Sequence, residues 1–115
     1  VANTALSNLA TAGQELVCSM WIEFSGPTTI KDSNNVSAIT DNATGDQDIN
    51  FAVAMDNANY AATASCSDSN QNSSLLVCHT SNNNTTSDVN LLTQMNDGTA
   101  QENASTTCVI FGGKS

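Results

Sequence analysis

Basic residues are almost absent from this chain. Lys31 and Lys114 are its only cationic side chains at neutral pH, against eleven acidic ones, and the formal net charge is −9. Affinity for nucleic acid depends largely on lysine and arginine that neutralise phosphates, so we expect no nucleic-acid partner, and the same argument disfavours anionic membrane surfaces. The sequence also lacks an apolar run of the roughly 18 or more residues that a transmembrane helix needs, so we expect no membrane insertion.

Aromatic residues are scarce as well. They make up 4% of the 115 residues, and the 39% hydrophobic fraction contains much alanine. A chain of this length has the size of one domain and can bury roughly 65% of its unfolded surface. Alanine buries little apolar area, so an alanine-rich core offsets the chain entropy less well than a leucine-rich one. This composition therefore favours an oligomeric partner.

The four cysteines do not follow a metal-binding pattern. None of Cys18, Cys66, Cys78 and Cys108 belongs to a C-x-x-C pair, which disfavours zinc. Each lies in an apolar, strand-like run, where a free thiol behaves as a small hydrophobic group. We favour buried free thiols, although an oxidising compartment would permit three disulfide pairings.

The first 15 residues differ from the rest. Leu6 and Leu9 are spaced for one helical face, and Gly13 is a suitable end, so we expect a short helix within residues 1–15. A helix of this length is marginal in water and has to pack on something. We expect the remaining residues, 16–115, to form a single β domain.

A period of two begins at residue 16. Met20, Ile22 and Phe24 fall on one side of a predicted strand, together with Cys18. A hairpin is predicted next, with strands at about 35–40 and 48–55 and a turn at 41–46 in which Gly45 can supply positive φ. Its second strand would place four apolar residues on one face: Ile49, Phe51, Val53 and Met55.

Further strands are expected at short intervals along the chain, at 60–66, 75–80, 89–95 and 106–111. Short strands separated by turn-forming residues indicate an all-β fold. We therefore predict an antiparallel β-sandwich or barrel-like module with a short N-terminal helix.

Catalytic patterns are missing. The only histidine, His79, follows Cys78 in a predicted strand, where neighbours face opposite sides, and no Gly-x-Ser-x-Gly motif is present. The three glutamates have few aromatic platforms near them, which disfavours glycoside hydrolysis. Asp41, Asp46 and Asp48 do not have the spacing of an EF-hand and fit a polar hairpin turn better. We predict no catalytic residues, no metal and no cofactor.

The hairpin region carries a resemblance to a known family. Residues 34–60, NNVSAITDNATGDQDINFAVAMDNANY, resemble a pattern that recurs in tailed-bacteriophage fibre proteins. Upstream, MWIEFSG at 20–26 is similar to the tryptophan-containing strand before that pattern, and CVIFGG at 108–113 is similar to the glycine-ended C-terminus of such chains. Residues 3–10 resemble the segment that joins a fibre shaft to its distal domain. Residues 66–107 match nothing in the family.

The resemblance implies a virion structural protein rather than an enzyme. Such proteins are commonly homotrimers that form the distal part of a tail or head fibre, bind other virion proteins and contact a host surface glycan or protein. A capsid decoration protein without receptor binding is the alternative, and a carbohydrate-active enzyme is an outlier.

Binding sites in such scaffolds usually lie on variable loops. We therefore expect host contacts in the polar loops at 67–74 and 81–87. Four candidate binding residues follow from this: Asp68, Asn70, Asn82 and Asn84.

Overall fold

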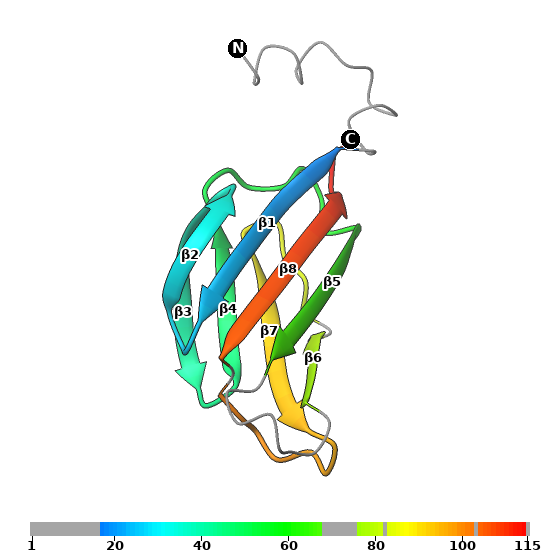
Figure 1. Ribbon diagram of the computed structural model, residues 1–115. Coiled ribbons are helices and arrows are strands. Elements are labelled where there is room, and N and C mark those ends of the chain that lie inside the picture. The colour runs from blue at the N-terminus through cyan, green and yellow to red at the C-terminus, as the bar shows by residue number, and fades with distance from the viewer. Residues whose placement is uncertain (1–16, 68–75, 82, 103, 115) are drawn as a thin grey trace.

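The structure, a computed structural model, describes residues 17–67, 76–81, 83–102 and 104–114. Eight strands and no helix lie in this part of the chain (Figure 1). They are β1 (Cys18–Ser25), β2 (Thr29–Asn34), β3 (Val36–Ala43), β4 (Asp46–Phe51), β5 (Tyr60–Ser67), β6 (Leu76–Thr80), β7 (Asp88–Met95) and β8 (Ser105–Gly112). The predicted helix falls outside the described residues. In the part that is described, no helix is long and apolar enough to span a membrane.

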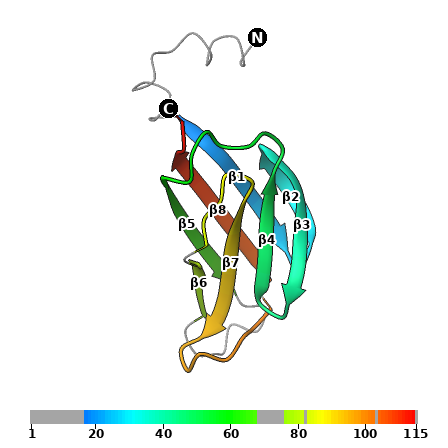
Figure 2. The same ribbon diagram turned by 180° about the vertical axis from the view of Figure 1, so that it is seen from behind.

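The strands form two four-stranded antiparallel sheets, which confirms the predicted all-β sandwich class. One sheet has the order β2-β1-β8-β5, and the other has the order β3-β4-β7-β6. The two views in Figure 1 and Figure 2 show the sheets as two layers, with β1 and β8 at the centre of one and β4 and β7 at the centre of the other. The first and last described strands, β1 and β8, are paired directly.

The core lies between the four central strands. With the exception of Met55, every buried apolar residue belongs to β1, β8, β4 or β7. These residues are Met20, Ile22, Phe24, Ile49, Phe51, Met55, Val89, Leu91, Cys108 and Ile110. Each alternates with an outward-facing neighbour, which is the period of two that β-strands impose. The edge strands supply only partly buried side chains to the core.

The predicted hairpin is present, but its second strand is shorter than expected. β3 pairs with β4 across a turn in which Gly45 has φ of 67°, as predicted. Ile49 and Phe51 are buried as expected, whereas Val53 was wrongly predicted as a core residue and is 67% exposed. The strand ends at Phe51, so the alternation that placed Val53 inward no longer applies.

Small side chains on β5 let the two sheets approach at one edge. Ala62 and Ala64 are partly buried and pack against the core. β5 contacts β6 of the opposite sheet, and these two strands close one side of the sandwich.

Two fully buried polar side chains, Gln47 and Thr106, have no hydrogen bond within the described residues. Gln47 on β4 is fully buried between the sheets, and neither its amide nitrogen nor its amide oxygen has a partner in the described part of the protein. An unpaired buried amide costs roughly 1–3 kcal/mol. The buried amide of Gln47 therefore lowers the free energy of unfolding.

Asn35 fixes the point at which the chain crosses from one sheet to the other. It has φ of 59°, a left-handed conformation that asparagine tolerates better than most residues. Its side-chain amide donates to the backbone oxygens of Ser19 and Val53 at 3.2 and 3.1 Å. Its side-chain oxygen accepts from the Val53 N–H at 2.7 Å. Asn35 thus joins β1, the β2–β3 corner and the chain after β4.

Substitution of Asn35 tests this corner. Asn35→Ala removes three side-chain hydrogen bonds and strains the left-handed backbone, so we expect a loss of about 3 kcal/mol or more in the free energy of unfolding. Asn35→Gly keeps the backbone conformation and should lose less. Asn34→Ala, an exposed neighbour, should change stability by less than about 0.5 kcal/mol. Urea denaturation measures all three, and equal losses for Ala and Gly would contradict the left-handed strain.

Candidate functional site

The two outer faces of the sandwich differ in chemistry. On the sheet β2-β1-β8-β5, one end of the outer face is apolar and carries Trp21, Val109 and Phe111. Trp21 lies directly opposite Val109 in the ladder, and Phe111 lies opposite Ala61 of β5. Trp21 is 38% exposed and Phe111 is 43% exposed. We refer to Trp21, Val109, Phe111 and Ala61 as the apolar face.

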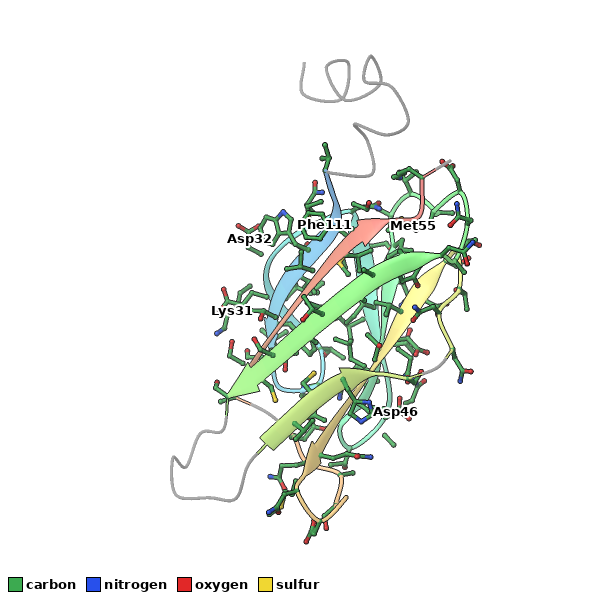
Figure 3. The ribbon with its side chains drawn as sticks, turned by 90° about the vertical axis from the view of Figure 1, so that its right-hand side faces the viewer. Lys31, Asp32, Asp46, Met55 and Phe111 are labelled. Carbon is green, nitrogen blue, oxygen red and sulfur yellow. The ribbon has the colours of Figure 1, made fainter. Side chains whose placement is uncertain are left out.

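The apolar face contains no charged residue. Farther along the same sheet, the Lys31 ammonium lies 3.3 Å from the Glu23 carboxylate, and Ser105 Oγ donates to the same carboxylate oxygen at 3.3 Å. Both charged side chains are well exposed, so this ion pair adds little to stability. Figure 3 shows Lys31 apart from Phe111 along the sheet. Asp32 on β2 lies opposite Glu23, so the charged groups of this sheet gather around Glu23, next to the apolar face and outside it.

The outer face of the sheet β3-β4-β7-β6 is polar along β4 and the first half of β7. Asp46, Asp48 and Asn50 alternate with the buried residues of β4, and Asp88 and Asn90 do so on β7. Asp48 lies directly opposite Asn90, and Asn50 lies opposite Asp88. Because cross-strand neighbours stand about 5 Å apart, these side chains form one continuous polar surface.

A shallow open groove runs over this polar surface, with a volume of about 350 Å³. Its lining consists of carboxylate, amide and hydroxyl side chains: Asn42, Asp46, Asp48, Asn83, Thr85, Asp88 and Asn90. Figure 3 places Asp46 towards the opposite end of the molecule from Phe111. We call this site the polar groove.

Asn90 holds two of the groove carboxylates together. Its side-chain amide donates to Asp46 Oδ1 and to Asp48 Oδ1, both at 2.7 Å. Asp46 Oδ1 also accepts from Asn42 at 3.3 Å. The amide hydrogens of Asn90 thereby partly offset the repulsion between two neighbouring carboxylates, and the second oxygen of each carboxylate is left as an acceptor.

The loop before β7 forms one side of the groove, and Tyr60 holds it in place. Thr85 Oγ1 accepts from the backbone N–H groups of Ser87 and Asp88 at 3.0 Å, a local turn that orders the loop. The Tyr60 hydroxyl donates between the backbone oxygens of Thr85 and Asp88, 3.0 Å from each. Its ring packs edge-on against Phe51 at 6.0 Å. The groove is thus tied to the core.

The structure describes only one of the four predicted binding residues. Asp68, Asn70 and Asn82 lie outside the described residues. Asn84 is half-buried between Asn83 and Thr85, two residues of the groove lining, although it does not itself line the groove.

Sequence reasoning missed most of the groove. Asp46 was assigned to the turn at 41–46, whereas it is the first residue of β4; Asp48 was predicted in the strand at 48–55 and lies in β4. Asn90 lies 42 residues after Asp48 and reaches it only through strand pairing. The one available signal was the alternation of β4, in which the polar residues on its outward face include two aspartates.

The groove can bind a ligand that donates several hydrogen bonds. Ionised carboxylates only accept hydrogen bonds, while amide and hydroxyl groups both donate and accept. A neutral ligand rich in hydroxyl groups fits this lining, and an anionic ligand does not. No aromatic side chain lines the groove, so stacking on a sugar ring is not available there.

Among the described residues, neither a metal-binding group nor a Cys78–His79 dyad is present. Within residues 17–67, 76–81, 83–102 and 104–114, no group of three or more His, Cys, Asp or Glu side chains could hold a metal ion. His79 is exposed on β6, while Cys78 packs against the core. The prediction that these neighbours face opposite sides is confirmed.

Titration of Tyr60 tests the anchoring of the groove loop. Burial, with a smaller contribution from the Asp88 carboxylate, raises the pKa of Tyr60 from 10.0 to about 12. Since the folded state keeps this proton where the unfolded state releases it, stability should fall as pH rises between about 10 and 12. Tyr60 is the only tyrosine, so phenolate absorbance reports it directly. A folded-state pKa equal to that in urea would contradict the buried hydroxyl.

The comparisons with known proteins do not assign this chain to a group. No family model, no curated protein and no solved structure matches it.

Proposed function

We propose that this protein is a structural domain of a bacteriophage virion, the distal part of a homotrimeric tail or head fibre, with no enzymatic activity. The observation that carries the proposal is the contrast between the two outer faces. The apolar face suits contact between subunits, and the polar groove suits contact with a ligand outside the particle.

The second half of β8 supports an interface on the apolar face. Cys108 and Ile110 are buried in the core, while Val109 and Phe111 on the other side of the strand are also apolar. A strand that is apolar on both faces is typical of sheets covered on both sides. Clustered exposed apolar side chains of this kind mark interaction sites in soluble proteins.

The distribution of charged side chains favours the apolar face as the one that joins copies of the chain. The polar groove carries the carboxylates of Asp46, Asp48 and Asp88, so two copies that met there would repel each other. The apolar face has no charge to desolvate. A second copy of the chain is therefore the occupant that we propose for the apolar face, and three copies around an axis give the closed assembly.

The resemblance of residues 34–60 to phage fibre proteins supports the virion assignment. In this protein those residues include the corner at Asn35, the turn at Gly45 and the buried Met55. They build the scaffold, which is the role expected of a pattern that recurs among fibres with different hosts.

Sedimentation equilibrium tests the assembly. The full chain should sediment with a mass three times 11.9 kDa at micromolar concentration. The double variant Trp21→Ser/Phe111→Ser should be a folded monomer, because both side chains are exposed in the isolated domain and contribute to the proposed interface.

Val77→Ser is the matched control. Val77 is 39% exposed on the opposite sheet, so its loss removes exposed apolar surface outside the apolar face, and the variant should remain a trimer. A monomeric wild-type chain, or a double variant that still forms trimers, would show that this face does not join subunits.

We propose that the polar groove makes the host contact, with a hydroxyl-rich surface glycan as the ligand. The groove offers at least two carboxylates held side by side by Asn90, within an anchored loop. Preorganised acceptors reduce the cost of ordering on binding.

An array of purified neutral polysaccharides from bacterial surfaces tests this contact. Asp48→Asn should weaken binding of the trimer to its glycan by about tenfold or more, since a charge-assisted hydrogen bond contributes roughly 1.5–3 kcal/mol. Asp32→Asn makes the same change on the other sheet and should bind as the wild type does. A trimer that binds no glycan on the array would contradict host contact and favour the capsid decoration alternative.

A further inference from the structure

The edge at which β5 meets β6 brings two cysteines together. These strands are the edge strands of different sheets, and they contact each other where the sandwich closes (Figure 1). Cys66 is the penultimate residue of β5, and Cys78 is the middle residue of β6. Ala62 and Ala64 on the inner face of β5 allow the close approach. The two cysteines therefore come from opposite layers of the fold.

The thiols of Cys66 and Cys78 lie close enough for each to influence the pKa of the other. Thr93 Oγ1 donates to Cys78 Sγ at 3.8 Å from β7. Both residues are half-buried, so a small reagent can approach them from solvent. In this structure all four cysteines are free.

We propose that Cys66 and Cys78 are a disulfide-forming pair, which joins the two sheets covalently at this edge when a disulfide oxidant is present. This inference is independent of the proposed function. A disulfide needs two cysteines whose backbones lie close together, and the contact between β5 and β6 brings these two strands near each other at the edge where both thiols lie. The bond would enclose the residues between positions 66 and 78 in one covalent loop.

The other two cysteines are less suited to the reaction. Cys108 is 1% exposed, so an oxidant cannot reach its sulfur while the domain is folded. Cys18 lies at the start of β1, where its thiol donates to the backbone oxygen of Met20 at 3.0 Å. Cys66 and Cys78 are the two thiols that are both half-buried and brought together where β5 meets β6.

The reaction follows thiol–disulfide exchange. The Cys66 thiolate attacks one sulfur of oxidised glutathione, forms a mixed disulfide and releases one glutathione. The Cys78 thiolate then attacks the Cys66 sulfur and releases the second glutathione. Two protein thiols are oxidised, the disulfide of the oxidant is reduced to two thiols, and the two protein protons pass to the released thiolates.

Cys66 is the better first nucleophile. Burial raises the pKa of both thiols, to about 11 for Cys78, and Cys66 is the less buried of the two. Because only the thiolate reacts, exchange at neutral pH should be slow and take minutes to hours.

Incubation of the full folded chain with oxidised glutathione tests the pair. Intact mass should fall by about 2 Da, the two hydrogens lost, and a peptide map made without reduction should contain one cross-link, between Cys66 and Cys78. The oxidised protein should melt roughly 5–10 °C higher than the reduced protein, since the closed loop restricts the unfolded chain.

Three single variants distinguish the cysteine that reacts first, the cysteine that completes the disulfide and a cysteine that takes no part. Cys78→Ser should stop at a glutathione adduct on Cys66, Cys66→Ser should form no cross-link, and Cys18→Ser should behave as the wild type does. The chain unfolded in urea serves as a check that the oxidant is competent. A cross-link that involves Cys108, or no cross-link in the folded chain under conditions that oxidise the unfolded chain, would overturn the proposal.

Discussion

The contact between the central strands of the two sheets is the interaction on which the rest of this structure depends. Met20, Ile22 and Phe24 on β1 face Ile49, Val89 and Leu91 of the other sheet, and all six are at most 1% exposed. Because side chains alternate along a strand, burying one face of β1, β8, β4 and β7 fixes which residues those strands present outward. The alternation of the central strands therefore places the residues of both the apolar face and the polar groove on the outside of the sandwich.

The fold was largely predictable because alternation is a local property. The buried residues of β1 and the turn at Gly45 followed from their neighbours in sequence. Val53 was misassigned because the end of β4 is set by Asn35, a residue 18 positions earlier that bonds to Val53. Gln47 lies between two aspartates and resembles a surface residue, yet the register of β4 buries it completely. Such exceptions depend on tertiary contacts that no local pattern contains.

The candidate sites were less predictable, since each depends on strands that are distant in sequence. Asp48 and Asn90 meet only through the pairing of β4 with β7, and Cys66 meets Cys78 only because the two sheets close at that edge. The hairpin of β3 and β4 contributes Asn42, Asp46 and Asp48 to the groove lining, while Ile49 and Phe51 lie in the core. A single domain thereby combines one scaffold with the apolar face, which we propose for assembly, and the polar groove, which we propose for a ligand.

The solvent exposure of Trp21 tests the central claim most directly, because Trp21 is the only tryptophan and lies on the apolar face. Acrylamide quenching of its fluorescence can be followed as the protein is diluted from micromolar to nanomolar concentration. If copies assemble through this face, Trp21 should be protected at high concentration, and quenching should rise with a red shift of the emission as the assembly dissociates. Quenching that is strong and independent of concentration would show that no second copy covers the apolar face.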